Sequence, residues 1–334
     1  MADAPLLSVR DLTVAFDTRR GTFEAVREVS FDVRPGRVLG VVGESGSGKS
    51  VTALAVAGLL PDTAAVTSGT ATWNGRNLLS LPERDMRAVR GREVAVVFQD
   101  PMSSLNPVLT IGRQLCQPLV VAAGLSRAAA RARAEELLAL VRIPSPAAVL
   151  RAYPHELSGG MRQRVMIAAA LSGNPRLLIA DEPTTALDVT TQAQILDLLR
   201  GLQERLHMAV MLITHDLGVV AEFADDVQVM YAGRVVERAP AASLFARPGH
   251  PYTEGLLRSV PPLDDGDTEG DWARGELPAI EGNVASPFAP PPGCAFHPRC
   301  AYAWDDCTRT VPPPFPLGPG HDAACLRHAA ALAA

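Results

Sequence analysis

The sequence predicts an α/β fold built on a mostly parallel sheet, and three features of the chain support this prediction. Short apolar runs end in polar or acidic residues at 38–42, 177–182 and 211–215. Such runs are typical of strands that are buried on both faces of a parallel sheet. A glycine-rich turn lies between the first run and the helix-like segment 51–57. Because ligands bind where the strands of such a sheet end, we expect the functional residues at these ends.

The glycine-rich turn matches the phosphate-loop pattern G-x-x-x-x-G-K-[ST], and its residues are Gly43, Glu44, Ser45, Gly46, Ser47, Gly48, Lys49 and Ser50. Its glycines allow the backbone N–H groups to converge, and the following helix adds its positive end. We expect Lys49 to contact the β- and γ-phosphates of ATP, and Ser50 to complete the shell of a Mg²⁺ ion. The alternative is a turn that binds nothing, which the flanking strand and helix disfavour.

The second apolar run delivers two acids, Asp181 and Glu182, at the end of a predicted buried strand. We expect Asp181 to hold Mg²⁺ through water, and Glu182 to accept a hydrogen bond from the attacking water as general base. An acidic pair after a strand is also typical of a solvated loop or a helix cap. The apolar lead-in and the phosphate loop upstream favour hydrolysis of ATP to ADP and phosphate.

Two further polar residues end apolar runs, Gln99 after 94–98 and His215 after 211–213. Gln99 is placed to reach the magnesium or the attacking water, and His215 to donate a hydrogen bond to the γ-phosphate. Taken alone, a glutamine at the end of a strand is more typical of the surface, and a histidine there is more typical of a satisfied residue at the edge of a sheet.

The run 157–164, Leu-Ser-Gly-Gly-Met-Arg-Gln-Arg, resembles the signature sequence of ATP-binding cassette (ABC) transporters. The resemblance covers the whole chain, with Walker A at 43–50, Walker B at 176–182, Gln99 as the Q-loop and His215 as the switch. It implies a P-loop NTPase cassette at 1–240, with a RecA-like core, an antiparallel β subdomain and a helical subdomain at about 100–163. An irregular, cysteine-rich extension is expected at 241–334.

In that family two cassettes pack head to tail around ATP. The resemblance therefore implies that Ser158, Gly159 and Gly160 of one cassette close over the γ-phosphate that its partner holds. The opening of a helix is a suitable anion site. Phe16 resembles the aromatic residue that stacks on adenine. Phe23 and Phe31 are alternatives for that position, and a core aromatic is the structural alternative for Phe16.

Two segments narrow the resemblance to the D-type ATPases of oligopeptide, dipeptide and nickel importers. Met161 replaces the usual glutamine of the signature, and 249–253 reads Gly-His-Pro-Tyr-Thr. The implied partners are a second, F-type ATPase, two membrane permeases, one of whose helices docks near Gln99, and an extracytoplasmic solute-binding protein. The expected cargo is di- or oligopeptides. Import of nickel or another small solute, and a cassette ATPase that acts on DNA or ribosomes, are the alternatives.

The composition fits this interpretation. The formal net charge is −5 and about half of the chain is apolar, which predicts a globular protein without general attraction to nucleic acid or anionic lipid. No apolar run reaches the roughly 18 residues that a membrane span requires, and the start of the chain is unlike a secretory signal. We therefore expect a peripheral protein at the cytoplasmic face of the membrane, bound through the permeases.

Four of the five cysteines crowd into the C-terminal part, namely Cys294, Cys300, Cys307 and Cys325. A reducing cytosol disfavours disulfides, so the cluster indicates a metal site. Four thiolates suit zinc or an iron–sulfur cluster, and the alternative ligands for a mixed zinc site are His297, His321 and His328. The segment resembles the cysteine-rich tail of D-type ATPases, which implies a 4Fe-4S cluster ahead of zinc or of unliganded thiols. Cys116 is expected to be a packed apolar residue.

Overall fold

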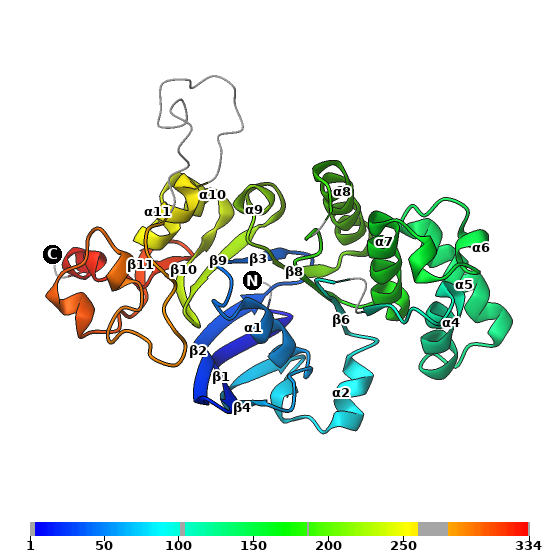
Figure 1. Ribbon diagram of the computed structural model, residues 1–334, viewed down its shortest axis with the longest axis horizontal. Helices are drawn as coiled ribbons and strands as arrows, with labels where there is room; N and C mark the ends of the chain where they lie inside the picture. The colour runs from blue at the N-terminus through cyan, green and yellow to red at the C-terminus, as the bar shows by residue number, and fades with distance from the viewer. Residues whose placement is uncertain (1–3, 101–103, 186, 260–279, 333–334) are drawn as a thin grey trace, which may run out of the picture. The chain divides into compact units, whose positions relative to one another are not determined.

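The computed structural model describes residues 4–100, 104–185, 187–259 and 280–332 (Figure 1). The chain forms two units, each built from separate stretches of sequence. Unit 1 comprises Met1–Leu6, Val33–Val38 and Ser80–Ile213, and unit 2 comprises Leu7–Asp32, Leu39–Leu79 and Thr214–Ala334. The runs at 177–181 and 211–213 therefore belong to unit 1, whereas the phosphate loop and the described residues of the C-terminal extension belong to unit 2.

The sheet of unit 1 is parallel, as the apolar runs predict. Its strands are β6 (Val94–Val97), β7 (Leu177–Asp181) and β8 (Ala209–Ile213), in the spatial order β8-β7-β6. Every residue of β7 and β8 is buried, which explains their continuous apolar sequence. In the register of this sheet Asp181 lies beside Ile213, so the acids lie at the carboxyl edge of the sheet.

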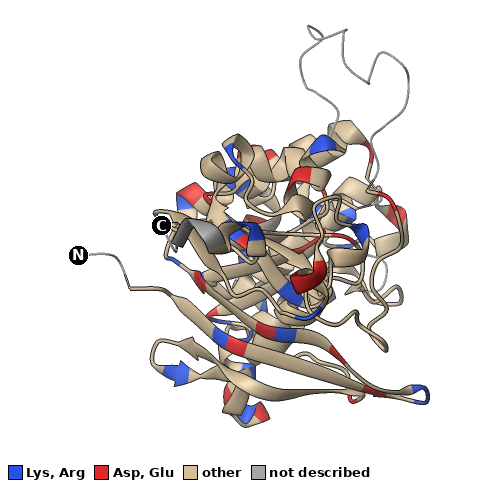
Figure 2. Cartoon of the chain, turned by 90° about the vertical axis from the view of Figure 1, so that its left-hand side faces the viewer, with Lys and Arg blue, Asp and Glu red and all other residues tan. Residues whose placement is uncertain are grey.

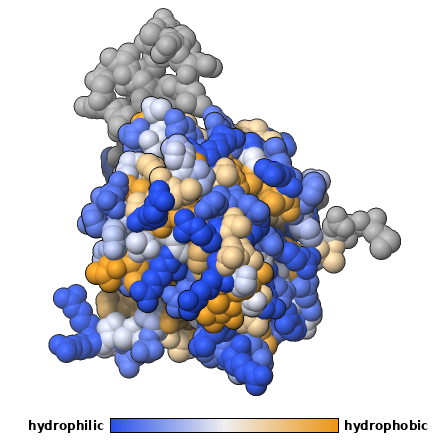
Figure 3. Space-filling model, turned by 90° about the vertical axis from the view of Figure 1, so that its right-hand side faces the viewer, coloured by the Kyte–Doolittle hydropathy of each residue, from blue (hydrophilic) through white to orange (hydrophobic). Residues whose placement is uncertain are grey.

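Helices account for most of the rest of unit 1. They are α2 (Glu83–Val89), α4 (Ile111–Val121), α5 (Arg127–Leu140), α6 (Pro146–Val149), α7 (Gly159–Ala170) and α8 (Val189–Leu206). Helices α4 to α6 occupy the range expected to be helical, and Ser126 caps α5 by accepting a hydrogen bond from the Ala129 amide. Cys116 is half-buried in α4, where burial raises the pKa of its thiol. Figure 3 shows the face that lies on the right-hand side of Figure 1, where hydrophobic patches are separated by hydrophilic side chains.

An antiparallel sheet forms the first part of unit 2, in the order β2-β1-β4-β5. Its strands are β1 (Leu7–Thr18), β2 (Gly21–Val33), β4 (Ala64–Trp73) and β5 (Arg76–Asn77). The β1–β4 register shifts between Arg10 and Thr13. There the backbone of β1 approaches Gly69 of β4 so closely that a Cβ atom at Gly69 would lie 2.6 Å from the Cα of Leu12. Residues of both charges lie along β1 and β2, whereas β4 has no charged residue (Figure 2).

The second sheet of unit 2 has the order β11-β12-β10-β9-β3. Strand β3 (Val38–Val42) is parallel to β9 (Asp226–Tyr231) and leads into the phosphate loop and α1 (Lys49–Val56). The extension contributes β11 (Phe315–Gly318) and β12 (His321–Ala323), which pair antiparallel beside β10 (Arg234–Pro240). The sequence did not predict these two strands, because they are too short to show a periodic pattern.

The described part of unit 2 also contains the helices α9 (Leu217–Phe223), α10 (Ala241–Ala246) and α11 (Pro251–Arg258). A core of aliphatic and aromatic residues joins them to the sheet, and Phe296 from the extension packs into it beside Tyr231 and Tyr252. The extension thus shares the core of the unit that carries the phosphate loop. Among the described residues, no helix combines the length and apolar character needed to cross a bilayer.

Candidate nucleotide-binding site

The phosphate loop adopts a conformation that its glycines make accessible. The φ angles are 149° at Gly43, 80° at Gly46 and 101° at Gly48, values that residues with a Cβ atom rarely adopt. Two of these glycines also lie against neighbouring backbone. A Cβ at Gly43 would lie 2.2 Å from the Met230 carbonyl oxygen, and one at Gly48 would lie 2.6 Å from the Ala25 carbonyl oxygen.

Lys49 is buried at the point where the loop leads into α1. Its Nζ donates hydrogen bonds to the carbonyl oxygens of Gly43 (2.7 Å) and Glu44 (3.0 Å). The Ser47 carbonyl accepts a bond from the Gly233 amide in the β9–β10 turn, which ties the loop to the sheet. A buried cation at the start of a helix is an arrangement that favours an anion such as a triphosphate.

A cavity of about 280 Å³ lies beside the loop within unit 2. Phe16 lines it together with Gly46 and Gly48, where the sequence places an adenine-stacking ring. Phe23 also lines the cavity, and its ring lies parallel to that of Phe16, with centroids 5.5 Å apart. The third candidate was wrong: Phe31 is fully buried within its strand and is therefore a core residue.

The cavity has a wall that sequence analysis missed. Residues Ala285, Ser286, Pro287 and Pro290 of the extension line it, and the Phe288 ring packs against Phe23 with centroids 4.8 Å apart. A stretch rich in proline with no periodic pattern offers no local signal for such a position. Only the fold of unit 2 brings this stretch to the cavity.

In unit 1 the structure brings Glu182 and Gln99 together. The Gln99 side-chain amide donates to Glu182 Oε2 at 2.9 Å, and the Thr185 hydroxyl donates to the same oxygen at 2.9 Å. Glu182 has a φ angle of 46°, which is unusual for a residue with a side chain and is typical of strained functional positions. Its backbone amide donates to the Ile213 carbonyl of β8. Glu182 is thus fixed in both backbone and side chain, while Thr185 is a partner that the sequence did not reveal.

Asp181 precedes Glu182 and is buried at the end of β7. His215 belongs to unit 2 and lies exposed just before α9, whose first turn is capped by the Asp216 carboxylate. Asp181 therefore ends one buried strand and His215 follows another, as the sequence predicts.

The signature turn begins α7 in unit 1. Ser158 is the N-cap, and its hydroxyl accepts a hydrogen bond from the Met161 amide at 3.3 Å. Ser158 and Gly159 are exposed, whereas Gly160 lies close to α8. A Cβ at Gly160 would lie 2.7 Å from the Thr191 Cγ2 atom. Gly160 is therefore required for packing within the subunit, a reason that its motif does not reveal.

The four C-terminal cysteines are free thiols that line one small cavity in unit 2, together with His297. Burial raises the pKa of Cys294 to about 11, and burial also raises the pKa of Cys300. Their side chains are not arranged as ligands: in the described ranges, no three His, Cys, Asp or Glu residues form a group that could hold a metal ion. His321 and His328 have other partners, Glu237 and the Gly249 carbonyl.

The phosphate loop, the strand-end acids and the serine-capped signature helix together define an ATP-binding cassette. Residues 26–185 match the family model described as ABC transporter, and residues 236–307 match the model described as oligopeptide/dipeptide transporter, C-terminal region. The chain belongs to the ABC transporter family, as an ATPase subunit with the C-terminal region found in oligopeptide and dipeptide transporters.

Relatives resemble the chain over nearly its whole length. It is 48% identical over 322 residues to the oligopeptide transport ATP-binding protein OppD of Salmonella typhimurium, covering 96% of this chain and 93% of the relative. It is 49% identical over 308 residues to the dipeptide transport ATP-binding protein DppD of Bacillus subtilis, covering 92% and 90%.

Solved structures share the fold. The ATP-binding cassette MJ0796, a dimer in a post-hydrolysis state with bound ADP and phosphate, matches with a TM-score of 0.63 and 28% identity over 70% of this chain and 98% of that one. The protein cbiO1 of Clostridium perfringens, part of an ABC transporter complex, matches with a TM-score of 0.63 and 27% identity over 73% and 92%. These matches confirm the predicted cassette fold.

Proposed function

We propose that this chain is the ATP-hydrolysing subunit of an importer of di- or oligopeptides, bound to the cytoplasmic face of the membrane through permeases. The match of residues 236–307 to the oligopeptide/dipeptide transporter C-terminal region carries the proposal. The names of the relatives OppD and DppD support it. In this proposal, residues 1–240 form the ATP-binding cassette and residues 241–334 form the C-terminal extension.

ATP and Mg²⁺ are the ligands that an ABC ATPase uses. The hydroxyl of Ser50 and the carboxylate of Asp181 are hard oxygen donors of the kind that Mg²⁺ prefers, and these residues would hold it. The ion neutralises phosphate charge when bound. Lys49 binds the β- and γ-phosphates, Phe16 stacks on the adenine, and His215 donates a hydrogen bond to the γ-phosphate.

Glu182 orients the attacking water and takes its proton. The bonds from Gln99 and Thr185 both reach one carboxylate oxygen, Oε2, and hold the carboxylate in one orientation. A base oriented in this way contributes roughly 10²- to 10⁴-fold to a rate. Because the Gln99 amide contacts the Glu182 carboxylate directly, a change in the charge or position of Glu182 would alter this hydrogen bond.

The second half of each ATP site comes from a partner cassette, an F-type subunit in this proposal. Ser158 and Gly159 are exposed at the start of α7, where an anion held by another subunit can be reached. The dimeric state described for MJ0796 supports this arrangement. Replacing Ser158 by Glu, with the equivalent serine of the partner also replaced, should abolish turnover while each chain still binds ATP alone.

The permeases are the partners that import requires. Exposed hydrophobic side chains in unit 1 include Phe98, directly before Gln99, and Val108 and Val121, which are 75% and 78% exposed. We assign the region around Gln99 to the docking of a short permease helix. An extracytoplasmic solute-binding protein would deliver the cargo.

The cysteine cavity is a proposed site for a 4Fe-4S cluster, with zinc as the alternative. All four thiols line one small cavity, but they do not form a preset metal-binding group in the part of the chain that the structure describes. Binding would therefore have to turn the side chains towards the metal and remove their protons, because ligands to metals are thiolates. The cluster would tie the extension together. Iron and zinc analysis with a visible spectrum of anaerobically purified protein tests it, with Cys307→Ser compared with Cys116→Ser. A colourless wild-type protein with neither metal would contradict the proposal.

Transport itself is the decisive test. The chain is co-expressed with candidate permease and partner ATPase subunits, and the complex is reconstituted with a candidate solute-binding protein in vesicles. We expect ATP-dependent uptake of labelled di- or oligopeptides that Glu182→Gln abolishes. Uptake of nickel instead of peptides would favour an importer of nickel or another small solute. If no membrane subunit co-purifies and DNA or ribosomes stimulate the ATPase activity, a cassette ATPase that acts on nucleic acid or ribosomes would be favoured.

A further inference from the structure

The C-terminal extension holds the second residue of the phosphate loop from two sides. The Glu44 amide donates a hydrogen bond to Tyr252 Oη at 2.8 Å. The Glu44 carboxylate accepts two hydrogen bonds from the Arg299 guanidinium, at 2.7 Å from Nη1 and 3.1 Å from Nη2. Such a two-pronged pair is among the stronger polar contacts in proteins. These partners are 208 and 255 residues away from Glu44 in the sequence.

Arg299 is itself held in place. Its side chain is only 4% exposed, and that of Glu44 is 26% exposed. The guanidinium also donates to the carbonyl oxygens of Glu281 (2.9 Å) and Ile280 (3.0 Å). Its Cζ atom lies 5.9 Å from the ring centroids of both Tyr231 and Phe296. An arginine with this many fixed contacts loses little conformational freedom by holding Glu44.

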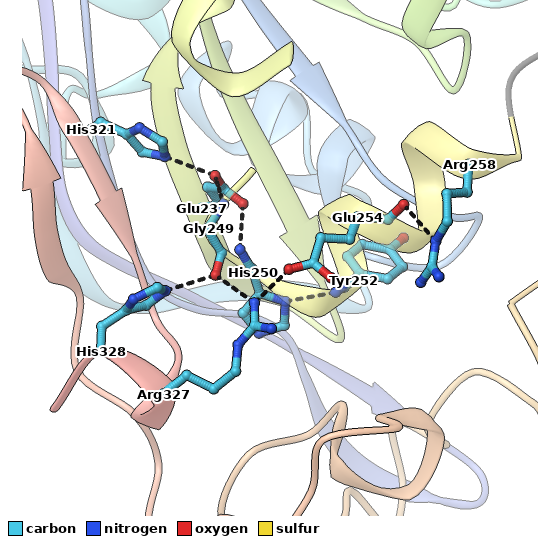
Figure 4. A network of polar contacts seen from close by, with 9 residues as sticks. All are labelled: Glu237, Gly249, His250, Tyr252, Glu254, Arg258, His321, Arg327 and His328. Atoms are coloured by element: carbon cyan, nitrogen blue, oxygen red, sulfur yellow. Dashed lines mark hydrogen bonds and ion pairs between the residues drawn. The ribbon is translucent and has the colours of Figure 1, made fainter. Parts of the chain in front are cut away.

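Tyr252 is fully buried and equally fixed. Its ring packs against Tyr231, with centroids 4.8 Å apart, and its amide donates to His250 Nδ1. The segment before it is anchored by a polar network (Figure 4). In this network the buried Glu237 accepts hydrogen bonds from the amides of Gly249 and His250. Burial raises the pKa of Tyr252 above its ordinary value, so its oxygen stays a neutral hydroxyl.

These contacts bear on the nucleotide because Lys49 depends on the same stretch of loop. The carbonyl oxygens of Gly43 and Glu44 are the acceptors of the Lys49 ammonium. Fixing Glu44 at its amide and its side chain therefore fixes the position of those carbonyls. In addition, an unneutralised carboxylate at Glu44 would repel a triphosphate at the loop.

We propose that Arg299 and Tyr252 are positioning residues for ATP binding, which hold the phosphate loop in its anion-binding conformation before the nucleotide arrives. Arg299 has the second task of neutralising Glu44. The inference rests on the assignment of this loop to ATP. A loop that is ordered in advance loses less conformational entropy on binding, so its affinity is higher.

The test is titration of the full-length chain with a fluorescent ATP analogue. Arg299→Met keeps the apolar stem that packs on the rings but removes the charge, and we expect about a tenfold rise in the dissociation constant, equal to about 1.4 kcal/mol. The kcat of the assembled ATPase at saturating ATP should stay near the wild-type value while KM rises. Glu44→Gln in the Arg299→Met background should recover part of the affinity, because the repelling charge is gone.

Tyr252→Phe removes a single oxygen atom, and we expect about a fivefold rise in the dissociation constant. The matched control is Arg309→Met, which alters an exposed arginine of the same extension that pairs with Asp305 and should leave ATP affinity unchanged. The melting temperature of each nucleotide-free variant monitors folding.

Wild-type affinity in a folded Arg299→Met chain would overturn the proposal, as would a loss of melting temperature without a loss of affinity. If Arg299→Met does not fold, Tyr252→Phe decides, and wild-type affinity in that variant overturns the proposal equally. By contrast, a wild-type chain that binds no ATP, or a Lys49→Ala chain that binds it normally, would contradict the assignment of the loop itself.

Discussion

Replacing Gly160 by alanine should destabilise the protein, although alanine normally favours helices. In α7 the new Cβ would lie 2.7 Å from Thr191 Cγ2, whereas carbon atoms in favourable contact lie about 3.5–4.0 Å apart. The Thr191 hydroxyl donates to Asp188 Oδ2 at 2.7 Å, so its methyl group cannot rotate away without breaking that bond. Overpacking of this kind costs about 1–3 kcal/mol.

The helix propensity of alanine offsets part of that cost, by at most about 1 kcal/mol. We therefore expect Gly160→Ala to lower the free energy of unfolding by about 1–2 kcal/mol, measured by urea denaturation with an unchanged m value. Thr191→Ser removes only the methyl group and keeps the hydroxyl. The double variant should therefore recover most of the lost stability.

Gly201 provides the matched control. It lies in α8, where an added Cβ would meet only the Arg142 side chain at 3.9 Å, an ordinary contact. Gly201→Ala should therefore stabilise the protein, by about 0.5–1 kcal/mol. The reasoning is refuted if Gly160→Ala is as stable as the wild type, or if Thr191→Ser does not rescue it.

Three further predictions concern chemistry and pH. Glu182→Gln should keep nucleotide affinity but lower the ATPase rate by roughly 10²-fold or more, measured as phosphate release; a wild-type rate would exclude Glu182 as the base. Lys49→Ala should weaken binding of a fluorescent ATP analogue by at least about tenfold, because a charge-assisted contact to phosphate is lost. Burial lowers the pKa of His250 to about 3 from its ordinary 6.5. As pH falls, His250 takes up a proton in the unfolded chain before it does so in the folded chain. The contribution of neutral His250 to the free energy of unfolding is therefore fully present above pH 6.5 and is lost as pH falls towards 3. The slope is at most about 1.4 kcal/mol per pH unit. His250→Asn should flatten this slope in urea denaturation at each pH, whereas the same change at the exposed His155 should not.

The phosphate loop, with its flanking strand and helix, was predictable because it is one short, contiguous motif. Gly43 and Lys49 are close in sequence, and the local rules of glycine turns and helix ends are enough to place them. The position of Glu182 directly after a strand was predictable because the apolar run 177–180 leads into it through Asp181. The bonds from Gln99 and Thr185 to Glu182 were not predictable in detail, since a motif specifies residue types but not which oxygen atom they contact.

By itself the sequence determined the class of fold, the phosphate loop, the strand-end acids and the family of the chain, because strands, helix starts and glycine turns depend on neighbouring residues. Only the tertiary structure decided how the extension meets the cassette. Arg299 and Phe288 belong to proline-rich segments without periodicity. Nothing in the neighbouring sequence shows that Arg299 binds Glu44, or that Phe288 packs against Phe23 at the cavity beside the phosphate loop. Such contacts arise from a shared core around Tyr252 and Phe296, which forms only when distant segments fold together.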